Sequence, residues 1–418
     1  MAESTSHGDG RRRGRGPALS RRSLIAGVAG AAGLGVGATA IAARSTDAAG
    51  DATHGGDVVE FHGVHQAGVT TPPTAHVNYV GLDLSADRGP QAREALAGIL
   101  RVWTEDAARL TRGTPALADS EPELARLPAR LTVTVGLGPG AFTATGLEGR
   151  RPRWLHPLPA YPIDRLDERR WGQTDLLLQI CSDDPVTVAH ATRVLTANVA
   201  GRVRLRWVQR GFRNSRGSQD EKVTMRNLMG QVDGTVNLGP ADSDTLVWDD
   251  GAEQPWFAGG TSMVLRRIAM DLDGWQEVDP RSQELSVGRT LTDGAPLSGG
   301  GEHDDPDFDK IVDGLPAIPA SSHIARARHR TPTERFLRRG YNYDDPPEPD
   351  ADGTIPISNS GLLFAAYQRD VDAQYVPVQA RLAEHDALNQ WTTPIGSAVY
   401  AVLPGARRGE VLGQGLLG

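Results

Sequence analysis

The order of its apolar segments is the feature that most restricts how this chain of 418 residues can fold. In the first half, segments with alternating apolar residues, which are typical of strands, are separated by segments with apolar residues at helical spacing. We predict strands at residues 76–84, 131–137 and 174–182, and helices at residues 91–112 and 185–200. This order is the content of a ferredoxin-like α+β unit, in which helices cover an antiparallel sheet.

The second half has similar content, although no sequence repeat is visible. We predict strands at residues 260–272, 361–368 and 397–403, a helix at 275–287 interrupted by Asp279-Pro280, a helix at 376–390, and a long loop at 293–319. The predicted fold class is α+β, with duplicated ferredoxin-like domains at residues 59–235 and 236–418, as in a dimeric α+β barrel. The length of the chain also exceeds the usual size of one domain.

Residues 1–44 are predicted to be an export signal. Arg21 and Arg22 stand within residues 20–24 and precede an apolar stretch rich in Gly and Ala at 24–43. This is the form of a twin-arginine signal peptide. The alternative is a single membrane anchor, but the many glycines make the stretch only moderately hydrophobic, which favours cleavage. Residues 45–58 are small and polar and are predicted to be the flexible N-terminus of the mature protein. We expect that protein to be extracellular or in the cell envelope, and periplasmic in a cell with two membranes.

Charge and cysteine content exclude several classes of protein. Without residues 1–44, which hold seven arginines and two acidic residues, the formal net charge changes from −8 to −13. Such a surface repels phosphate backbones, so we expect no nucleic-acid partner. The single cysteine, Cys181, excludes a disulfide framework, a thiolate iron–sulfur cluster and a cysteine-based zinc site. No second long apolar run is present, which argues against a protein that spans a membrane several times.

Three sequence settings suit catalysis or binding, although each is common by itself. His323 follows a Pro-rich segment where a loop enters a helix or turn, and Asp233 lies between glycines in residues 230–234. Arg338 and Arg339 stand between an apolar pair and Gly340. Taken singly, these are a surface histidine, an Asp-Gly turn and a half-buried arginine paired with an acid. His62 and His65 suggest a metal pair, but no third ligand lies nearby in the sequence, which favours a turn with solvated imidazoles.

In combination and in this order, the motifs resemble those of the dye-decolourising (DyP-type) haem peroxidases. The resemblance is to the branch exported by twin-arginine signals, which also includes the deferrochelatase/peroxidase proteins. It runs from about residue 61 to residue 404, nearly the whole mature chain. Its motifs lie at residues 61–71, 226–237, 259–275, 322–326, 337–343, 361–370 and 394–405.

The resemblance implies an exported haem b peroxidase with one haem per chain, held in the C-terminal half. His323 would be the proximal ligand of the haem iron, and Asp233 the distal acid–base residue. Arg338 would be the distal arginine, which favours the anionic aspartate and stabilises the charge that develops as the O–O bond breaks. Asp233 and Arg338 would thereby also border the bound cofactor. Hydrogen peroxide would be reduced through a ferryl intermediate, and phenolic or dye-like donors would be oxidised.

Alternatives remain open at this point. The chain could be a deferrochelatase-type protein that releases iron from haem, whereas a non-catalytic haem carrier would not need both Asp233 and Arg338. A register shift of one residue would make Arg339 the distal arginine. Family members usually place a carboxylate beside the proximal histidine, and alignment puts Gln390 there, which would raise the reduction potential of the iron. The sequence leaves open the natural donor and whether the protein is a homo-oligomer.

Overall fold

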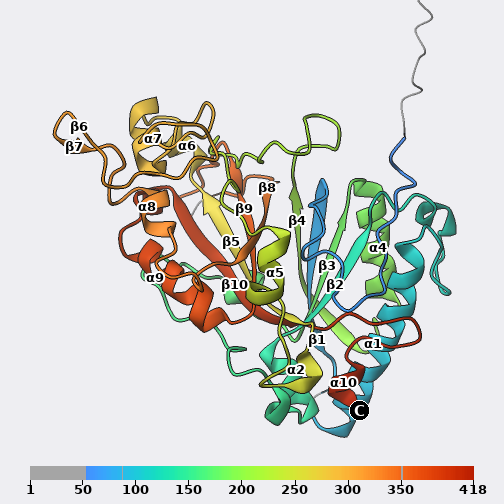
Figure 1. The fold of residues 1–418 in the computed structure, drawn as a ribbon. Coiled ribbons are helices and arrows are strands. Elements are labelled where there is room, and N and C mark those ends of the chain that lie inside the picture. The colour runs from blue at the N-terminus through green and yellow to red at the C-terminus, as the bar shows by residue number, and fades with distance from the viewer. Residues whose placement is uncertain (1–52, 87, 350–351) are drawn as a thin grey trace, which may run out of the picture. The chain divides into compact units, whose positions relative to one another are not determined.

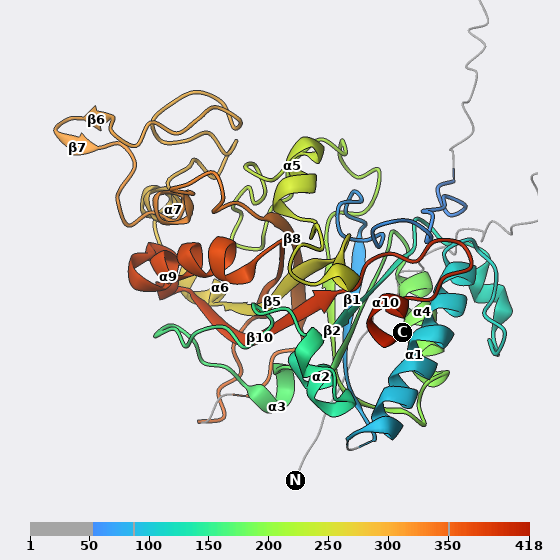
Figure 2. The same cartoon turned by 60° about the horizontal axis from the view of Figure 1, so that its bottom comes forward.

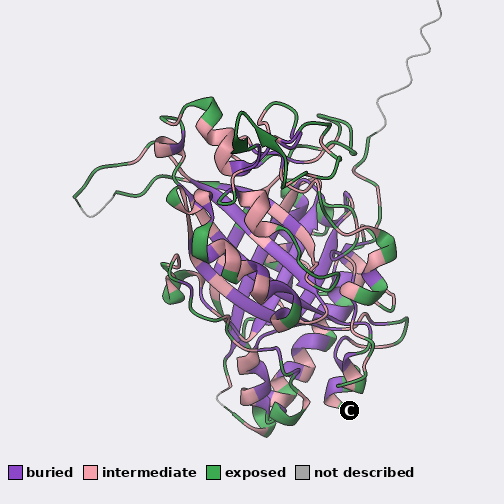
Figure 3. Cartoon of the chain, turned by 60° about the vertical axis from the view of Figure 1, so that its left-hand side comes forward, coloured by how far each residue is buried: buried purple, intermediate pink, exposed green. Residues whose placement is uncertain are grey.

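The computed structural model describes residues 53–86, 88–349 and 352–418. Its centre is a closed barrel of antiparallel strands in the order β1-β3-β2-β10-β5-β9-β8-β4 (Figure 1). Figure 3 shows that these strands are mostly buried, while exposed residues gather in the loops and on the outer faces of the helices. The barrel strands are β1 (His76–Leu84), β2 (Thr132–Leu137), β3 (Leu176–Ser182), β4 (Val203–Phe212), β5 (Thr261–Met270), β8 (Leu337–Asp345), β9 (Asn359–Gln368) and β10 (Thr392–Val402).

The barrel consists of two four-stranded sheets with the same topology. The two halves are β4-β1-β3-β2 and β10-β5-β9-β8. When the strands of each half are numbered 1 to 4 along the chain, their order across the sheet is 4-1-3-2, which is that of a ferredoxin-like unit. Two short contacts join the sheets: β10 pairs with β2 through Ala401↔Leu137 and Val402↔Gly136, and β4 pairs with β8 through Phe212↔Asn342. The predicted duplicated α+β fold is therefore confirmed, while the domain limits 59–235 and 236–418 stay a prediction.

The helices of the first half cover its sheet. α1 (Pro90–Leu110) buries Ile99 and Trp103, and the indole Nε1 of Trp103 donates a hydrogen bond to the carbonyl of Leu195 in α4 (Pro185–Ala197) at 2.8 Å. Asp184 caps the N-terminus of α4 with its carboxylate, which satisfies backbone N–H groups of the first turn. The shorter helices here are α2 (Pro139–Thr145) and α3 (Glu168–Trp171).

The helices of the second half surround the region of the predicted site residues. α8 (His323–Ala327) packs beside α9 (Val376–His385) and α7 (Pro280–Val287), as Figure 1 shows. The other helices are α5 (Pro240–Leu246), α6 (Leu272–Trp275) and α10 (Gln414–Leu417). A two-stranded hairpin of β6 (Ile311–Val312) and β7 (Leu315–Pro316) interrupts the predicted loop and extends away from the body in Figures 1 and 2.

Two strands of the barrel, β4 and β8, were not among the predicted elements. In β4, Val203, Leu205 and Trp207 alternate with arginines, which is a period-2 signal for a strand with one polar face. The predicted helix at 275–287 is helical only from Pro280 onward. α6 ends at Trp275, and Asp279 caps a new helix, α7, that Pro280 begins.

None of the helices among the described residues is long and apolar enough to span a membrane. The predicted signal peptide, residues 1–44, lies outside the described residues.

Candidate functional site

Asp233 and Arg338 come together although they are far apart in the sequence. Nη1 of Arg338 donates a hydrogen bond to Oδ1 of Asp233 at 3.2 Å. The side chains are 25% and 18% exposed, so solvent reaches a pair that is otherwise covered by protein. Salt screens a partly buried pair less than a surface pair. The contact thus places the carboxylate of Asp233, which can accept or donate a proton, beside the permanent positive charge of Arg338.

Asp233 is presented by a turn between β4 and α5. Its backbone N–H donates to the carbonyl of Met225 at 2.8 Å, which closes the turn. The flanking glycines, Gly230 and Gly234, have φ angles of +81° and +133°, a region that residues with a side chain rarely adopt. The glycines around Asp233 in the sequence therefore shape the turn that directs its carboxylate.

The pleat of β8 separates Arg338 from Arg339, because successive side chains of a strand point to opposite faces. Asn237 holds the backbone of Arg338 from both sides: its Nδ2 donates to the Arg338 carbonyl and its Oδ1 accepts from the Arg338 N–H, each at 2.8 Å. Arg339 is only 2% exposed, and its Nη1 donates to the carbonyl of Thr71 at 2.6 Å. Of the two neighbouring arginines, Arg338 is the one in contact with Asp233.

His323 begins α8, and a distant carboxylate holds its ring. Nδ1 of His323 lies 2.6 Å from Oδ2 of Asp386, whose side chain is 4% exposed. Burial lowers the pKa of His323, but the charge and hydrogen bond of Asp386 outweigh this and leave the pKa above its ordinary value. The other ring nitrogen, Nε2, makes no hydrogen bond within the described part of the chain. A histidine oriented in this way by a carboxylate is typical of a metal ligand.

The prediction that Gln390 stands beside His323 is wrong. The helix predicted to reach residue 390 ends at His385, and Asp386 follows it at the start of a 3-10 turn. One Asp386 oxygen accepts the backbone N–H of Leu388 at 3.0 Å, and the other contacts His323. Gln390 is exposed. The partner of the imidazole is therefore a carboxylate, about one helical turn before the predicted position.

A cavity of about 220 Å³ contains the Asp233–Arg338 pair. Arg213, directly after β4, also lines it and donates from Nε to the carbonyl of Gly340 at 2.7 Å. Burial lowers the pKa of the Arg213 guanidinium. The charges of Asp233 and Arg338 act in opposite directions on the pKa of His323. The three residues predicted from the sequence therefore lie in one electrostatic environment.

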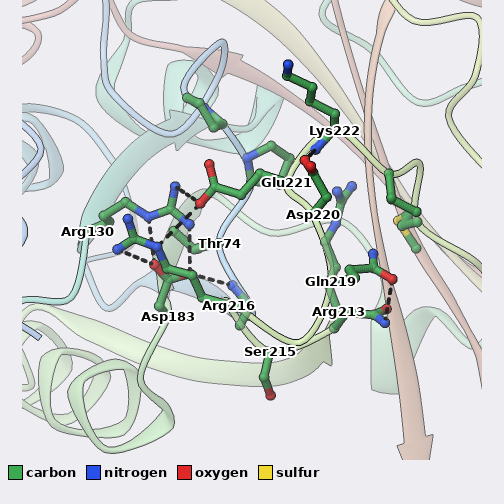
Figure 4. A pocket seen from close by; sticks show the side chains of 17 residues that line it. Thr74, Arg130, Asp183, Arg213, Ser215, Arg216, Gln219, Asp220, Glu221 and Lys222 are labelled. Carbon is green, nitrogen blue, oxygen red and sulfur yellow. Dashed lines mark hydrogen bonds and ion pairs between the residues drawn. The ribbon is translucent and has the colours of Figure 1, made fainter. Parts of the chain in front are cut away.

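A second cavity, of about 340 Å³, adjoins the first one and is shown in Figure 4. In a part of its wall that the first cavity does not share, Oδ2 of Asp183 lies 2.6 Å from Nε of Arg130 and 3.7 Å from Nη1 of Arg216. This polar wall suits a passage for small polar molecules. The residues that line both cavities are Pro73, Arg213, Glu221, Lys222, Val223 and Met225.

His62 and His65 make structural contacts away from this cavity. Nδ1 of His62 lies 3.2 Å from the carbonyl of Ala406, and Nδ1 of His65 lies 2.8 Å from that of Gly259. The ring of His65 is also stacked on Trp248, with 3.9 Å between the ring centroids. The two histidines therefore link the N-terminal segment to later parts of the chain.

Sequence reasoning missed three residues that complete the site: Asp386, Asn237 and Arg213. The sequence around Asp386 could have indicated a cap, because an aspartate side chain often accepts the backbone N–H two residues later, as Asp386 does from Leu388. Nothing in the sequence ties it to His323. Asn237 and Arg213 are held by hydrogen bonds to the backbone of β8, which is distant from both in the sequence.

Comparisons with known proteins point to one family. The family models described as "Dyp-type peroxidase, N-terminal" and "Dyp-type peroxidase, C-terminal" match residues 66–213 and 224–407. A dye-decolorizing peroxidase of Thermobifida fusca is 38% identical over 84% of this chain and 83% of its own length. A deferrochelatase of Yersinia pseudotuberculosis is 34% identical over 95% of each chain.

Solved structures agree with these sequence matches. A DyP-type peroxidase from Cellulomonas bogoriensis is 54% identical, with a TM-score of 0.83 over 88% of this chain and 99% of that one. Ferric DtpA from Streptomyces lividans is 39% identical, with a TM-score of 0.81 over 87% of this chain and 98% of that one.

Gly288 allows the close approach of α7 to the helix that carries His323, and its replacement should test this contact. It has a φ of +90°, and an added Cβ would lie 2.6 Å from Cγ1 of Ile324 and 2.9 Å from Oγ of Ser322. We expect Gly288→Ala to lower the free energy of unfolding by about 1–2 kcal/mol through backbone strain and by about 1–3 kcal/mol more through overpacking. Urea unfolding followed by circular dichroism measures the loss.

The matched control is Gly146→Ala. Gly146 also ends a helix, with a φ of +68°, but its added Cβ would meet no atom within 4 Å. It should show the strain without the overpacking, and equal losses in the two variants would contradict the proposed contact.

Proposed function

Because this chain belongs to the Dyp-type peroxidase family, we propose that it is an exported peroxidase that reduces hydrogen peroxide at the Asp233–Arg338 pair and oxidises phenolic or dye-like donors. The enzyme is a haem peroxidase, and its substrates are hydrogen peroxide and organic electron donors. The observation that carries the assignment of residues is the contact of 3.2 Å between Arg338 and Asp233, in one electrostatic environment with the carboxylate-bound His323.

The residues present suit haem. Nδ1 of the His323 imidazole is held by Asp386 at 2.6 Å, so Nε2 would be the nitrogen that binds the haem iron. His323 would therefore be the proximal ligand that holds the haem, and Asp233 and Arg338 would act on the hydrogen peroxide. Haem, when bound, supplies the electrons that reduce the peroxide and then accepts electrons one at a time from the donor.

Asp233 would move a proton between the two oxygens of hydrogen peroxide. Cleavage of the O–O bond is easiest when one oxygen loses its proton and the departing oxygen receives one. The turn around Asp233 and its bond to Arg338 hold the carboxylate in one place, so that it can perform both steps. Arg338 would stabilise negative charge on the departing oxygen, because its charge is fixed and Asn237 anchors its backbone.

The two adjoining cavities would supply the route for peroxide. They share Arg213, Lys222 and Met225, so a molecule in the outer cavity is adjacent to the one that holds Asp233. Hydrogen peroxide is small, polar and uncharged. The charges of Arg130 and Arg216 are compensated by Asp183 and Glu221, so this wall would neither repel nor retain it. Bulky donors are larger than an inner cavity of about 220 Å³ and would pass electrons from outside it.

Replacement of Arg338 tests the proposed function. In the haem-loaded enzyme, we expect Arg338→Ala and Asp233→Asn to retain haem and to slow the reaction with hydrogen peroxide by about 100- to 10,000-fold, because each loses a group that acts only in bond cleavage. Stopped-flow absorption measures the rate, and the Soret band measures haem content.

The control is Arg335→Ala. Arg335 lies three residues before Arg338 but pairs with Asp242 at 2.9 Å and does not line the cavity of Asp233. Its rate should be that of the wild type. A wild-type rate in haem-loaded Arg338→Ala would refute the proposed role of Arg338.

The partner of His323 can be tested through the reduction potential. Asp386→Asn removes the negative charge beside the imidazole, so the iron is less well stabilised in its oxidised state and the potential should rise, with activity or haem affinity falling by about 10- to 100-fold. Gln390→Ala, at the exposed position predicted from the sequence, should leave the potential unchanged. Spectroelectrochemical titration of both variants measures the potential. A raised potential in Gln390→Ala and an unchanged one in Asp386→Asn would indicate that Gln390 is the partner of His323.

Export by the twin-arginine route is proposed from Arg21 and Arg22. Changing both to lysine should leave the full-length protein inside the cell, whereas changing Arg12 and Arg13 to lysine should not, since that pair is not followed directly by the apolar stretch. Cell fractionation with an antibody measures the distribution. Undiminished export of the Arg21→Lys, Arg22→Lys protein would contradict this route.

The relatives named deferrochelatase favour a second candidate, release of iron from haem with the porphyrin left intact. The two activities differ in their products. Iron-free porphyrin, seen by its fluorescence, together with released iron trapped by a chelator would indicate deferrochelatase activity. Haem that stays intact through many turnovers of peroxide would support the peroxidase.

A further inference from the structure

We propose that Asp119, Glu121 and His190 bind one Zn²⁺ ion in the N-terminal half of the protein. Asp119 and Glu121 lie just before the 3-10 turn at Pro122–Ala125, and His190 lies in α4. None of the three lines either of the cavities near Asp233. The site would therefore be separate from the peroxidase centre.

The three side chains converge in space. One possible ligand atom from each lies within 4.8 Å of the other two. Nε2 of His190 is 3.0 Å from Oδ1 of Asp119, and these side chains are 2% and 0% exposed. Glu121 approaches from the surface, with a side chain that is 43% exposed. Asp119 and His190 are therefore buried, whereas Glu121 is free to move on its solvent-exposed side.

The unsatisfied oxygen of Asp119 points to a missing ligand. Oδ1 accepts bonds from His190 and from the backbone N–H of Glu121, at 3.0 Å each. Oδ2 is buried and has no hydrogen-bond partner within the described residues. A buried carboxylate oxygen without a partner is costly, because it has lost its hydration. A cation beside Oδ2 would remove this cost.

The surrounding charge also favours a cation. Asp106, in α1, adds a third carboxylate; it accepts a hydrogen bond from Asn198 at 2.8 Å, and burial raises its pKa, with the charge of Asp119 adding to the effect. The cations near these acids are Arg193, which pairs with Glu121 and has a side chain 51% exposed, and Arg109, whose charge lowers the pKa of Asp106. Arg109 is itself paired with Glu105 at 3.9 Å. The region therefore has more negative than positive groups.

The donor set suits zinc. Imidazole nitrogen and carboxylate oxygens bind Zn²⁺ at about 2.0–2.2 Å, and three protein ligands with one water give a tetrahedral site. Ligand atoms in such a site are about 3.3 Å apart. Closure from separations of up to 4.8 Å therefore requires a movement of at most about 1.5 Å. Glu121, on the exposed side, can make this movement. The ion would fasten the segment before Pro122 to α4.

The test is calorimetric titration of the haem-loaded enzyme with zinc chloride, after dialysis against a chelator and then against chelator-free buffer. We expect one Zn²⁺ per chain, and at least a tenfold loss of affinity in Asp119→Asn and in Glu121→Gln. Zinc should also raise the midpoint of thermal unfolding of the wild type, because it binds only the folded protein. Neither measurement depends on peroxidase activity.

The control variant is His156→Gln. His156 also contacts an aspartate, Asp372, at 3.2 Å, but this pair is exposed and no third ligand group accompanies it among the residues described. Zinc binding should be unchanged there. Should Asp119→Asn fail to fold, Glu121→Gln decides alone, since it leaves the buried pair intact. The proposal is overturned if the wild type takes up no stoichiometric zinc, if Glu121→Gln binds it as tightly, or if His156→Gln abolishes binding.

Discussion

The hydrogen bonds that close the barrel are the constraint on which the rest of the structure depends. Each sheet by itself has two open edges, and the contacts of β10 with β2 and of β4 with β8 each remove one edge from each sheet. The second of these contacts borders the candidate site. This contact sets the end of β4, with Arg213, beside Gly340 of β8. The cavity of Asp233 and Arg338 is built at this junction, so it exists only when both halves are folded and joined.

Two elementary rules of backbone geometry then arrange the charged groups. The alternation of side chains along β8 sends Arg338 to Asp233 and Arg339 into the barrel. Positive φ at Gly230 and Gly234 turns the chain sharply around Asp233. The pair is thus preorganised by the backbone, and a preorganised charge pair need not rearrange as bonds break.

Two carboxylates, Asp386 and Asp233, belong to the candidate site, and they have different surroundings. Asp386 is almost fully buried and bound to an imidazole, so its charge acts on His323. Asp233 is more exposed, borders a cavity and is bound to a guanidinium. The first is suited to hold a ligand in one orientation and the second to exchange protons with small molecules, so that one residue type can serve two purposes.

The sequence by itself determined the order of most strands and helices, the duplicated fold class, and three residues that the fold brings to one region. These features depend on local periodicity or on short motifs of consecutive residues, and both can be read without knowledge of distant contacts. The tertiary structure decided what lies between distant segments: the closure of the barrel, the choice of Arg338 over Arg339 as the partner of Asp233, and Asp386 in place of Gln390 beside His323. A displacement of one helical turn leaves an apolar pattern almost unchanged but moves a carboxylate by about 5 Å along the axis. Contacts of this kind are therefore decided by packing.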